Sequence, residues 1–191
     1  MLRIPLLGAA AALSLTILLA AGSGDSSSLP QYDKTGHLLR PADYREWVFL
    51  SSGLGMTYSQ SMGDPMFTNV FVPKWAYEEF LKDGKWPDKT TFVVEERSSA
   101  SKGSINKAGH FQTDFEGMGV EVKDSRFPEQ WAYFNFGEQD KSAEANPKEA
   151  CWQCHEDHAA VEHSFVQFYP TLKPVAKKFG TYKESAEKIA Q

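Results

Sequence analysis

The sequence predicts an α+β domain in which an antiparallel β-sheet is flanked by helices. Residues 90–97, 111–122 and 131–136 are rich in β-branched and aromatic side chains, and turn-forming or polar residues separate them. These features are typical of neighbouring strands in an antiparallel sheet. Segments with apolar residues at helical spacing precede these strands and return at the C-terminus. This order of elements favours the α+β class.

The first part of the chain is expected to contain two short helices and one strand. Residues 41–50 have apolar side chains at helical spacing, and Pro41 suits a first helical turn. Residues 66–72 follow an Asp-Pro turn and are predicted to form a strand. Residues 73–81 are predicted to form the second helix, which an Asp-Gly pair ends.

The clearest predicted strand covers residues 90–97. Alternation places Phe92 and Val94 on one face of this strand and Val93 on the other. The charged residues near its end are expected to form a solvated edge that discourages pairing with other sheets. They are Glu95, Glu96 and Arg97.

The last part of the chain changes from strand-like to helix-like patterns. A polar connection leads to a helix that is expected to begin at Pro147 and to end near residue 160, with Asn146 as its cap. Residues 165–179 are expected to be mostly helical, with interruptions at two prolines.

Residues 1–22 have the layout of a secretory signal peptide, with an early positive charge, an apolar run and small residues at the end. A retained membrane anchor is the alternative, because the apolar run approaches the length that spans a bilayer. We expect removal of this leader, a flexible linker over residues 23–30 and a single domain over residues 31–191. The mature protein is then expected in the periplasm, without membrane contact.

The charge balance excludes two classes of partner. The chain has 20 Lys and Arg residues against 25 Asp and Glu residues, which gives a formal net charge of −5. A nucleic-acid partner or an anionic lipid surface would call for a basic cluster, and the sequence contains none.

The most informative stretch is Cys151-Trp152-Gln153-Cys154-His155, which has the C-x-x-C-H pattern of c-type haem attachment. Two thiols three positions apart can form thioethers with the two vinyl groups of one porphyrin. The histidine then supplies an imidazole nitrogen to the iron as the proximal ligand. Export agrees with this interpretation, since covalent haem attachment in bacteria takes place outside the cytoplasmic membrane. One covalent haem c is therefore expected.

Two other uses of these residues remain open. A dithiol redox site needs only the C-x-x-C part of the motif. A zinc site could combine the two cysteines with His158 and His163, although this spacing differs from that of the usual zinc finger. Otherwise, both histidines are expected to lie at the surface.

Beyond the motif, the chain resembles the cytochrome P-460 family and, within it, the branch called cytochromes c′-beta. The resemblance covers nearly all of the mature chain. Besides the haem motif, it rests on residues 40–48 (RPADYREWV), 69–72 (NVFV), 102–106 (KGSIN), 122–125 (VKDS), 131–133 (WAY) and 168–170 (FYP).

This resemblance implies an antiparallel sheet with surrounding helices, a homodimer, and a five-coordinate c-type haem with an open distal side. Such an iron is expected to bind nitric oxide or carbon monoxide, for sensing, storage or detoxification, and a periplasmic redox partner is expected. A simple electron carrier is an alternative, in which methionine commonly fills the sixth position. The candidate methionines are Met56, Met62, Met66 and Met118.

A second alternative is a hydroxylamine or nitric oxide oxidoreductase with a cross-linked haem. Family members that oxidise hydroxylamine carry a lysine bonded to the porphyrin, and an acid and an arginine near the iron. Matched along this chain, the lysine position falls on Val94, the acid on Gly119 and the arginine on Thr68. The enzyme is therefore less favoured, although Glu116 and Glu121 lie close to the acid's position.

The candidate distal pocket is built mainly from one face of two strands. Phe92 should face the same way as Val94, and Val70 and Thr68 are candidates from the preceding strand, with Phe67 as a further one. An apolar wall of this kind would admit small uncharged diatomic molecules and would offer no hydrogen bond to bound oxygen. Ordinary core packing is the alternative for each aromatic residue.

Overall fold

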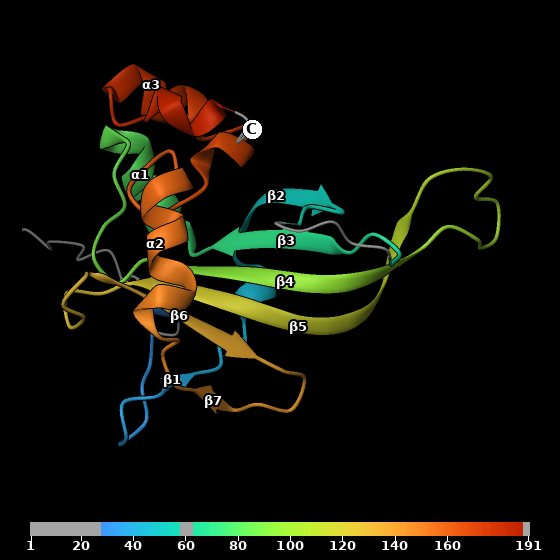
Figure 1. Ribbon diagram of the computed structural model, residues 1–191, viewed down its shortest axis with the longest axis horizontal. Helices are drawn as coiled ribbons and strands as arrows, with labels where there is room; N and C mark the ends of the chain where they lie inside the picture. Colours follow the sequence, from blue (N-terminus) through green and yellow to red (C-terminus); the bar gives the residue numbers. More distant parts are fainter. Residues whose placement is uncertain (1–27, 58–62, 189–191) are drawn as a thin grey trace, which may run out of the picture.

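The computed structural model describes residues 28–57 and 63–188 of the chain (Figure 1). Its centre is a five-stranded antiparallel sheet in which strands that follow one another in the sequence are also neighbours in space. The strands, in spatial order, are β2 (Val48–Leu54), β3 (Phe67–Val72), β4 (Thr91–Ala100), β5 (Phe111–Lys123) and β6 (Trp131–Phe136). A small second sheet pairs β1 (Leu38–Leu39) with β7 (Ser142–Ala143).

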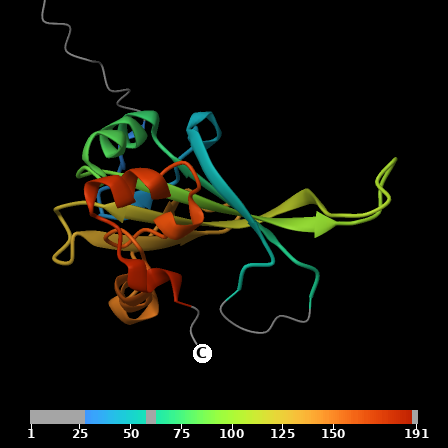
Figure 2. The same cartoon turned by 90° about the horizontal axis from the view of Figure 1, so that it is seen from above.

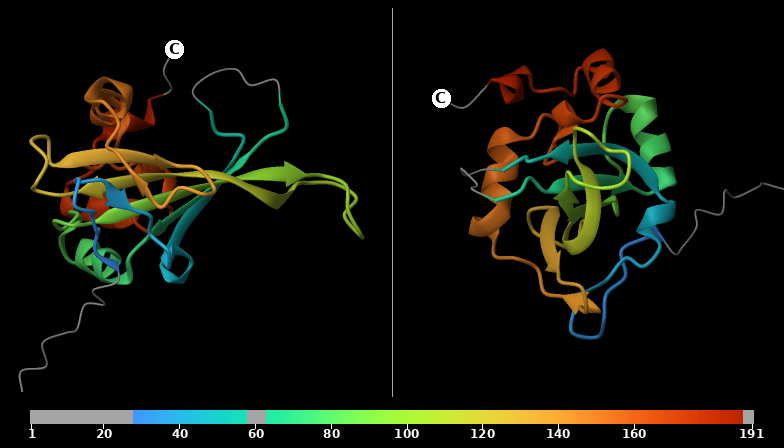
Figure 3. Two further views of the ribbon diagram at one scale, coloured as in Figure 1. Left: turned by 90° about the horizontal axis from the view of Figure 1, so that it is seen from below. Right: turned by 90° about the vertical axis from the view of Figure 1, so that its right-hand side faces the viewer.

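The helices gather at one end of the large sheet, and the β4–β5 hairpin projects beyond the other strands at the opposite end (Figures 1 and 2). They are α1 (Lys74–Asp83), α2 (Lys148–His158) and α3 (Lys173–Phe179). Short 3₁₀ turns lie at η2 (Tyr44–Glu46), η3 (Val166–Phe168) and η4 (Glu184–Glu187). Seen along the strands, the β1–β7 pair lies on the side of the large sheet away from α3 (Figure 3).

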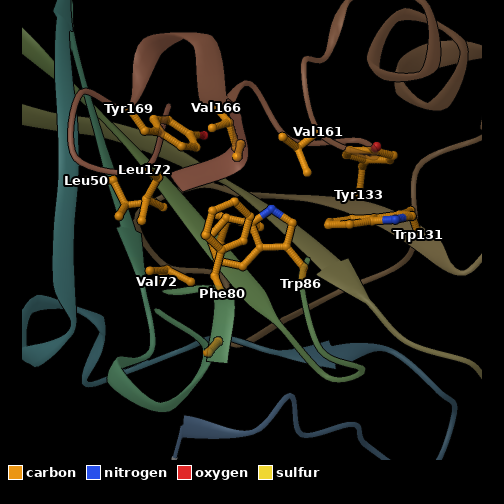
Figure 4. Close-up of a cluster of buried hydrophobic side chains, with 13 residues drawn as sticks. Leu50, Val72, Phe80, Trp86, Trp131, Tyr133, Val161, Val166, Tyr169 and Leu172 are labelled. Carbon is orange, nitrogen blue, oxygen red and sulfur yellow. The ribbon is translucent and has the colours of Figure 1, made fainter. Parts of the chain in front are cut away.

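Each face of the sheet has its own hydrophobic core, because alternate residues of a strand point to opposite faces. The first core contains Phe92 of β4 together with side chains from α1, α2 and α3, and Figure 4 shows several of its members. The second core contains Val93 of β4 together with Leu38 of β1 and Tyr44 of η2. The alternation predicted for Phe92 and Val93 is therefore confirmed, and we call these two sides the helix face and the N-terminal face.

The α+β class, the antiparallel sheet and the helical C-terminus are confirmed. The helix predicted over residues 41–50 is wrong, since only Tyr44–Glu46 is helical and β2 begins at Val48. The helix-like spacing involved Tyr44, Trp47 and Val48, but from Val48 onward the backbone pairs with β3. Hydrogen bonding to a neighbouring strand therefore overrides the local pattern.

The predicted signal peptide at residues 1–22 and most of the linker at residues 23–30 lie outside the described residues. Within residues 28–57 and 63–188, no helix combines the length and apolar character that crossing a bilayer requires.

Candidate functional site

Helix α2 carries the C-x-x-C-H motif and presents its reactive side chains on one side. Cys151, Cys154 and His155 are three and four positions apart, so they share one helix face. Pro147 precedes the first helical turn, where its missing N–H costs nothing. The predicted cap by Asn146 is wrong, because no side chain caps this helix and the Asn146 amide lies 3.6 Å from Cys151 Sγ. Both thiols are free and half-buried.

The imidazole of His155 is held in a defined orientation. Its ring lies between Tyr133 and Phe165, with centroid distances of 4.4 Å and 4.6 Å. Its Nδ1–H donates a hydrogen bond of 2.7 Å to the backbone carbonyl of His163. Since Nδ1 carries the proton, Nε2 keeps its lone pair, as a metal-binding histidine requires.

A tight turn after α2 brings that carbonyl into place. Val161 and Ser164 exchange backbone hydrogen bonds of 3.3 Å and 2.8 Å, and Glu162 between them has a positive φ of 50°. The turn reverses the chain, so that the carbonyl of His163 faces back toward His155.

The surface position predicted for His163 is wrong, since only 7% of this residue is exposed. Its Nδ1 lies 3.2 Å from the Tyr133 hydroxyl, and its Nε2 lies 3.1 Å from a Glu156 carboxylate oxygen. Burial, reinforced by His155 and nearby lysines, lowers the pKa of His163 to about 4. A neutral ring fits both contacts, because Nδ1 can accept from Tyr133 while Nε2–H donates to Glu156. His158, by contrast, is exposed as predicted.

The helix face of the sheet continues the site. The register aligns Phe92, Glu121 and Tyr133 in one row across β4, β5 and β6. Both Tyr133 and Glu121 lie close to His155. Phe92 is fully buried, with its ring 4.8 Å from that of Trp86. Among the described residues, Phe92 contacts other side chains of the hydrophobic core. Its contact with the haem therefore stays a prediction.

The other candidate distal residues lie in the next rows of the same face. Val70, Val94 and Gly119 are paired across β3, β4 and β5, and all three are partly exposed. Thr68 lies one row further along, opposite Glu96. The register thus brings Val70 and Val94 together as expected, whereas Thr68 and Phe92 lie in the rows on either side of them.

Glu121 is the site residue that sequence reasoning did not select. Its Oε1 lies 3.9 Å from His155 Nε2, and only 8% of the residue is exposed. Its Oε2 is buried without a hydrogen bond in the described part of the chain. Burial raises the pKa of this carboxyl, and nearby His155 opposes that rise. Alternation along β5 indicates that Glu121 shares a face with Gly119, but its distance to His155 depends on how α2 packs.

The residues present fit a covalently attached haem. The motif supplies two free thiols and an imidazole whose Nε2 has no hydrogen bond within the described residues. Two buried polar atoms at the motif also lack partners there: Nε1 of Trp152, which is part of the motif, and Oε2 of Glu121. A Cβ added at Gly119 would make only an ordinary van der Waals contact, with Val94 Cβ at 4.0 Å. When bound, a haem would supply an iron for reversible ligand binding and electron transfer.

The zinc alternative lacks a ligand set in the structure. Among the described residues, no three His, Cys, Asp or Glu side chains are grouped so that they could hold a metal ion. His163, which that alternative needs, instead bridges Tyr133 and Glu156.

Comparison with known proteins identifies the family of this chain. A search of curated proteins found no match. The family model described as Cytochrome P460 matches residues 41–166, which include β2 to β6, α2 and the turn at His163. This match covers more than half of the chain, and it includes the whole C-x-x-C-H motif. The chain therefore belongs to the cytochrome P460 family and is a haem protein.

Proposed function

We propose that this chain is an exported monohaem c-type cytochrome that binds a small gaseous ligand, nitric oxide or carbon monoxide, at a five-coordinate ferrous iron. Cys151 and Cys154 hold the porphyrin through thioether bonds, and His155 is the proximal ligand. Within the family, we place the chain in the cytochrome c′-beta branch.

The observation that carries this proposal is the fixed imidazole of His155. The Nδ1–H bond to the His163 carbonyl sets the tautomer, and Nε2 points away from it with a free lone pair. A backbone acceptor on a proximal histidine is the arrangement that fixes the tautomer and the ring orientation of the ligand. The two thiols on the same helix face then limit which edge of a porphyrin can lie against α2.

An open distal side is supported by where the described methionines lie. Met118 is buried in the core of the N-terminal face, on the opposite side of the sheet. Met56 follows β2 and Met66 precedes β3, and these residues are 50% and 38% exposed. Met62 is outside the described residues. None of the three described side chains lies against His155, which disfavours the simple electron carrier.

The apolar side chains of the helix face select the ligand. Val70 and Val94 offer no hydrogen bond to a bound molecule. Uncharged diatomic molecules lose little on leaving water for such surroundings, whereas anions lose much of their solvation.

The cross-linked oxidoreductase is the second candidate, and one observation favours it. Glu121 supplies a buried carboxyl near His155, although the matched acid position is Gly119. Proton transfer from hydroxylamine would need such a group. Against this candidate, Val94 cannot bond to the porphyrin, and β4 from Thr91 to Ala100 contains no lysine.

The leader, the C-x-x-C-H motif and the family resemblance together support a cellular setting for the protein. We propose a periplasmic location after removal of the signal peptide, a homodimer and a redox partner that reduces the iron. The excess of acidic residues behind the net charge of −5 disfavours nucleic acids as partners.

The experiment records absorption spectra of the exported protein before and after reduction with dithionite, and then with carbon monoxide or nitric oxide. We expect an ordinary c-type Soret band, a high-spin ferrous spectrum and a shift on addition of either gas. His155→Ala should abolish the five-coordinate ferrous spectrum, while His158→Ala, an exposed histidine on the same helix, should leave it unchanged. A low-spin six-coordinate ferrous spectrum would contradict the proposal and favour an electron carrier.

A further inference from the structure

The carbonyl that accepts the hydrogen bond from His155 belongs to a residue whose own ring is buried and held at both nitrogens. His163 Nδ1 lies 3.2 Å from the Tyr133 hydroxyl, and His163 Nε2 lies 3.1 Å from a carboxylate oxygen of Glu156. The ring also packs against that of Trp152, with 4.7 Å between their centroids. Packing alone would need only an apolar side chain at this position, so the two polar contacts call for another explanation.

These contacts connect three elements of the fold around the imidazole of His155. Tyr133 comes from β6, and its ring lies 4.4 Å from that of His155. Glu156 is the next residue of α2. His163 lies in the turn after this helix, and its carbonyl accepts the 2.7 Å hydrogen bond from His155 Nδ1. The His163 ring therefore ties the carbonyl that orients His155 to both the strand and the helix beside it.

The turn that presents this carbonyl has a conformation that needs support. Glu162 has a φ of 50°, a left-handed backbone conformation that residues other than glycine rarely adopt. The far end of the turn is fixed by Ser164, whose hydroxyl accepts a hydrogen bond of 2.7 Å from Trp86 Nε1 and donates one of 2.8 Å to the Val161 carbonyl. The ring of His163 fixes the residue between Glu162 and Ser164. Without its two polar contacts the His163 carbonyl could rotate, and a hydrogen bond weakens as its angle departs from linear.

We propose that the side chain of His163 is a positioning residue for the proximal ligand, because its bonds to Tyr133 and Glu156 hold the His163 carbonyl on His155 Nδ1. This inference rests on the haem site proposed above. A hydrogen bond donated by Nδ1–H makes an imidazole a more basic ligand at Nε2. A more basic ligand favours ferric over ferrous iron, since the ferric centre carries one more positive charge. The His163 ring thus strengthens the bond between His155 and the iron and lowers the reduction potential.

The first test removes one tyrosine hydroxyl from each face of the sheet. Tyr133→Phe takes away the hydrogen-bond donor to His163 and keeps the ring beside His155. Tyr32→Phe is the matched control, since this hydroxyl bonds to Asp124 and the Tyr32 ring packs on the N-terminal face. In resonance Raman spectra of the ferrous haem protein, the iron–histidine stretching band should move to lower frequency in Tyr133→Phe and stay in place in Tyr32→Phe.

The reduction potential of the same two variants should follow the band. Substitution of a residue that orients a metal ligand typically costs about 10–100-fold. We expect the lower end of this range, a tenfold shift of the equilibrium toward ferrous iron in Tyr133→Phe, which corresponds to a potential about 59 mV higher for one electron. An unchanged band and potential in Tyr133→Phe would overturn the proposal, and so would equal changes in the two tyrosine variants.

The second test separates position from charge at Glu156. Glu156→Ala removes the acceptor of His163 Nε2–H, whereas Glu156→Gln keeps an amide oxygen that can accept the same hydrogen bond. Both variants remove one negative charge, and Asp157→Asn removes one from the next residue, which is exposed and bonds to Gln153. Glu156→Ala should lower the band frequency, while the other two variants should leave it in place. Equal band shifts in Glu156→Ala and Glu156→Gln would show an effect of charge and would contradict the positioning role.

The outcomes separate the two proposals. If denatured protein retains no haem, the proposed function fails. If the haem is retained and the ferrous protein binds carbon monoxide, but Tyr133→Phe leaves the iron–histidine band in place, only the role of the His163 ring is wrong. Should Tyr133→Phe prevent haem loading, the comparison of Glu156→Ala with Glu156→Gln decides the question with the same spectra.

Discussion

The two faces of the sheet each bury one glutamate, and the two carboxyl groups have opposite surroundings. On the N-terminal face, Glu95 is 2% exposed and accepts hydrogen bonds from Tyr44, Arg45, Arg97 and Asn69. On the helix face, Glu121 is 8% exposed and has no hydrogen-bonded partner in the described residues. The exposed fraction therefore does not distinguish the two glutamates, which differ in the groups that surround each carboxyl.

This difference separates a structural acid from a functional one. The two arginines and the hydroxyl around Glu95 compensate the loss of water, and they tie β4 to η2 across the N-terminal face. Glu121 has only His155 near it, at 3.9 Å, and burial raises the pKa of its carboxyl, as is common for acids in functional sites. The following predictions test this contrast, beginning with the largest expected effect on stability.

Glu95→Ala should lower the free energy of unfolding by about 3–5 kcal/mol, because it leaves buried donors without their acceptor. Urea denaturation of the haem-loaded protein, followed by circular dichroism, measures this loss. Glu96→Ala is the control, since Glu96 is the next residue on β4 and is exposed, and it should change stability by less than about 0.5 kcal/mol. Similar small losses for both variants would show that the network around Glu95 contributes little.

Asp124→Asn tests a second buried acid that has partners. Asp124 is fully buried and interacts with Lys89, the Arg126 backbone N–H and the Tyr32 hydroxyl. Burial would raise its pKa, but the hydrogen bonds from Lys89 and Arg126 outweigh this and hold the pKa below the ordinary value of 3.8. Asparagine should cost about 1.5–3 kcal/mol at neutral pH.

The lowered pKa of Asp124 determines how its contribution to stability changes with pH. Because the folded state binds the proton of Asp124 less readily than the unfolded state, the carboxylate's contribution is complete above pH 3.8 and is lost as the pH falls through the lower folded value. Urea titrations at several acidic pH values should therefore show the stability gap between Asp124→Asn and the unaltered protein closing below pH 3.8. A gap that stays constant at all pH values would mean that the charge of Asp124 does not stabilise the fold.

Gly119→Leu tests whether the porphyrin lies over Gly119 and Val94. An alanine methyl group at position 119 would make only an ordinary contact with Val94, at 4.0 Å, whereas a leucine side chain would extend further from the sheet. The ratio of haem to protein after expression should fall several-fold for Gly119→Leu and stay unchanged for Gly119→Ala. Equal haem loading in the two variants would place the porphyrin elsewhere.

Glu121→Gln should have the smallest effect on stability. No protein hydrogen bond is lost, so the free energy of unfolding of the reduced protein should change by no more than about 1 kcal/mol. Urea denaturation of the reduced, haem-loaded protein measures this value. A loss as large as that of Glu95→Ala would show that Glu121 has a structural partner and would remove the contrast between the two faces.

The sequence predicted local features better than long-range ones. The alternation of Phe92 and Val93 and the start of α2 after Pro147 depend on neighbouring residues, and both were predictable. The solvated edge expected at Glu95 was wrong, because its partners Tyr44 and Arg45 lie about fifty residues earlier in the chain. Nothing in the local pattern of β4 indicates that η2 packs over this strand.

The candidate site shows the same division between local and long-range features. The C-x-x-C-H motif selects His155 as the candidate iron ligand from five consecutive residues. His163 was expected at the surface, but a tight turn brings its carbonyl to His155 and its ring to Tyr133. Glu121 was one of two neighbours of the matched acid position. Alternation along β5 places it on the face of Gly119, and the packing of α2 on β6 brings it close to His155.

We propose that Cys151 and Cys154 hold a haem whose ferrous iron, bound by His155, is open to a gaseous ligand. The most direct measurement denatures the exported protein, records whether haem remains with the polypeptide, and compares native ferrous spectra before and after carbon monoxide. Our account predicts retained haem, an ordinary c-type Soret band and a shift with the gas. Loss of all haem on denaturation would contradict covalent attachment, and a strongly red-shifted ferrous Soret band would contradict the absence of a cross-link at Val94.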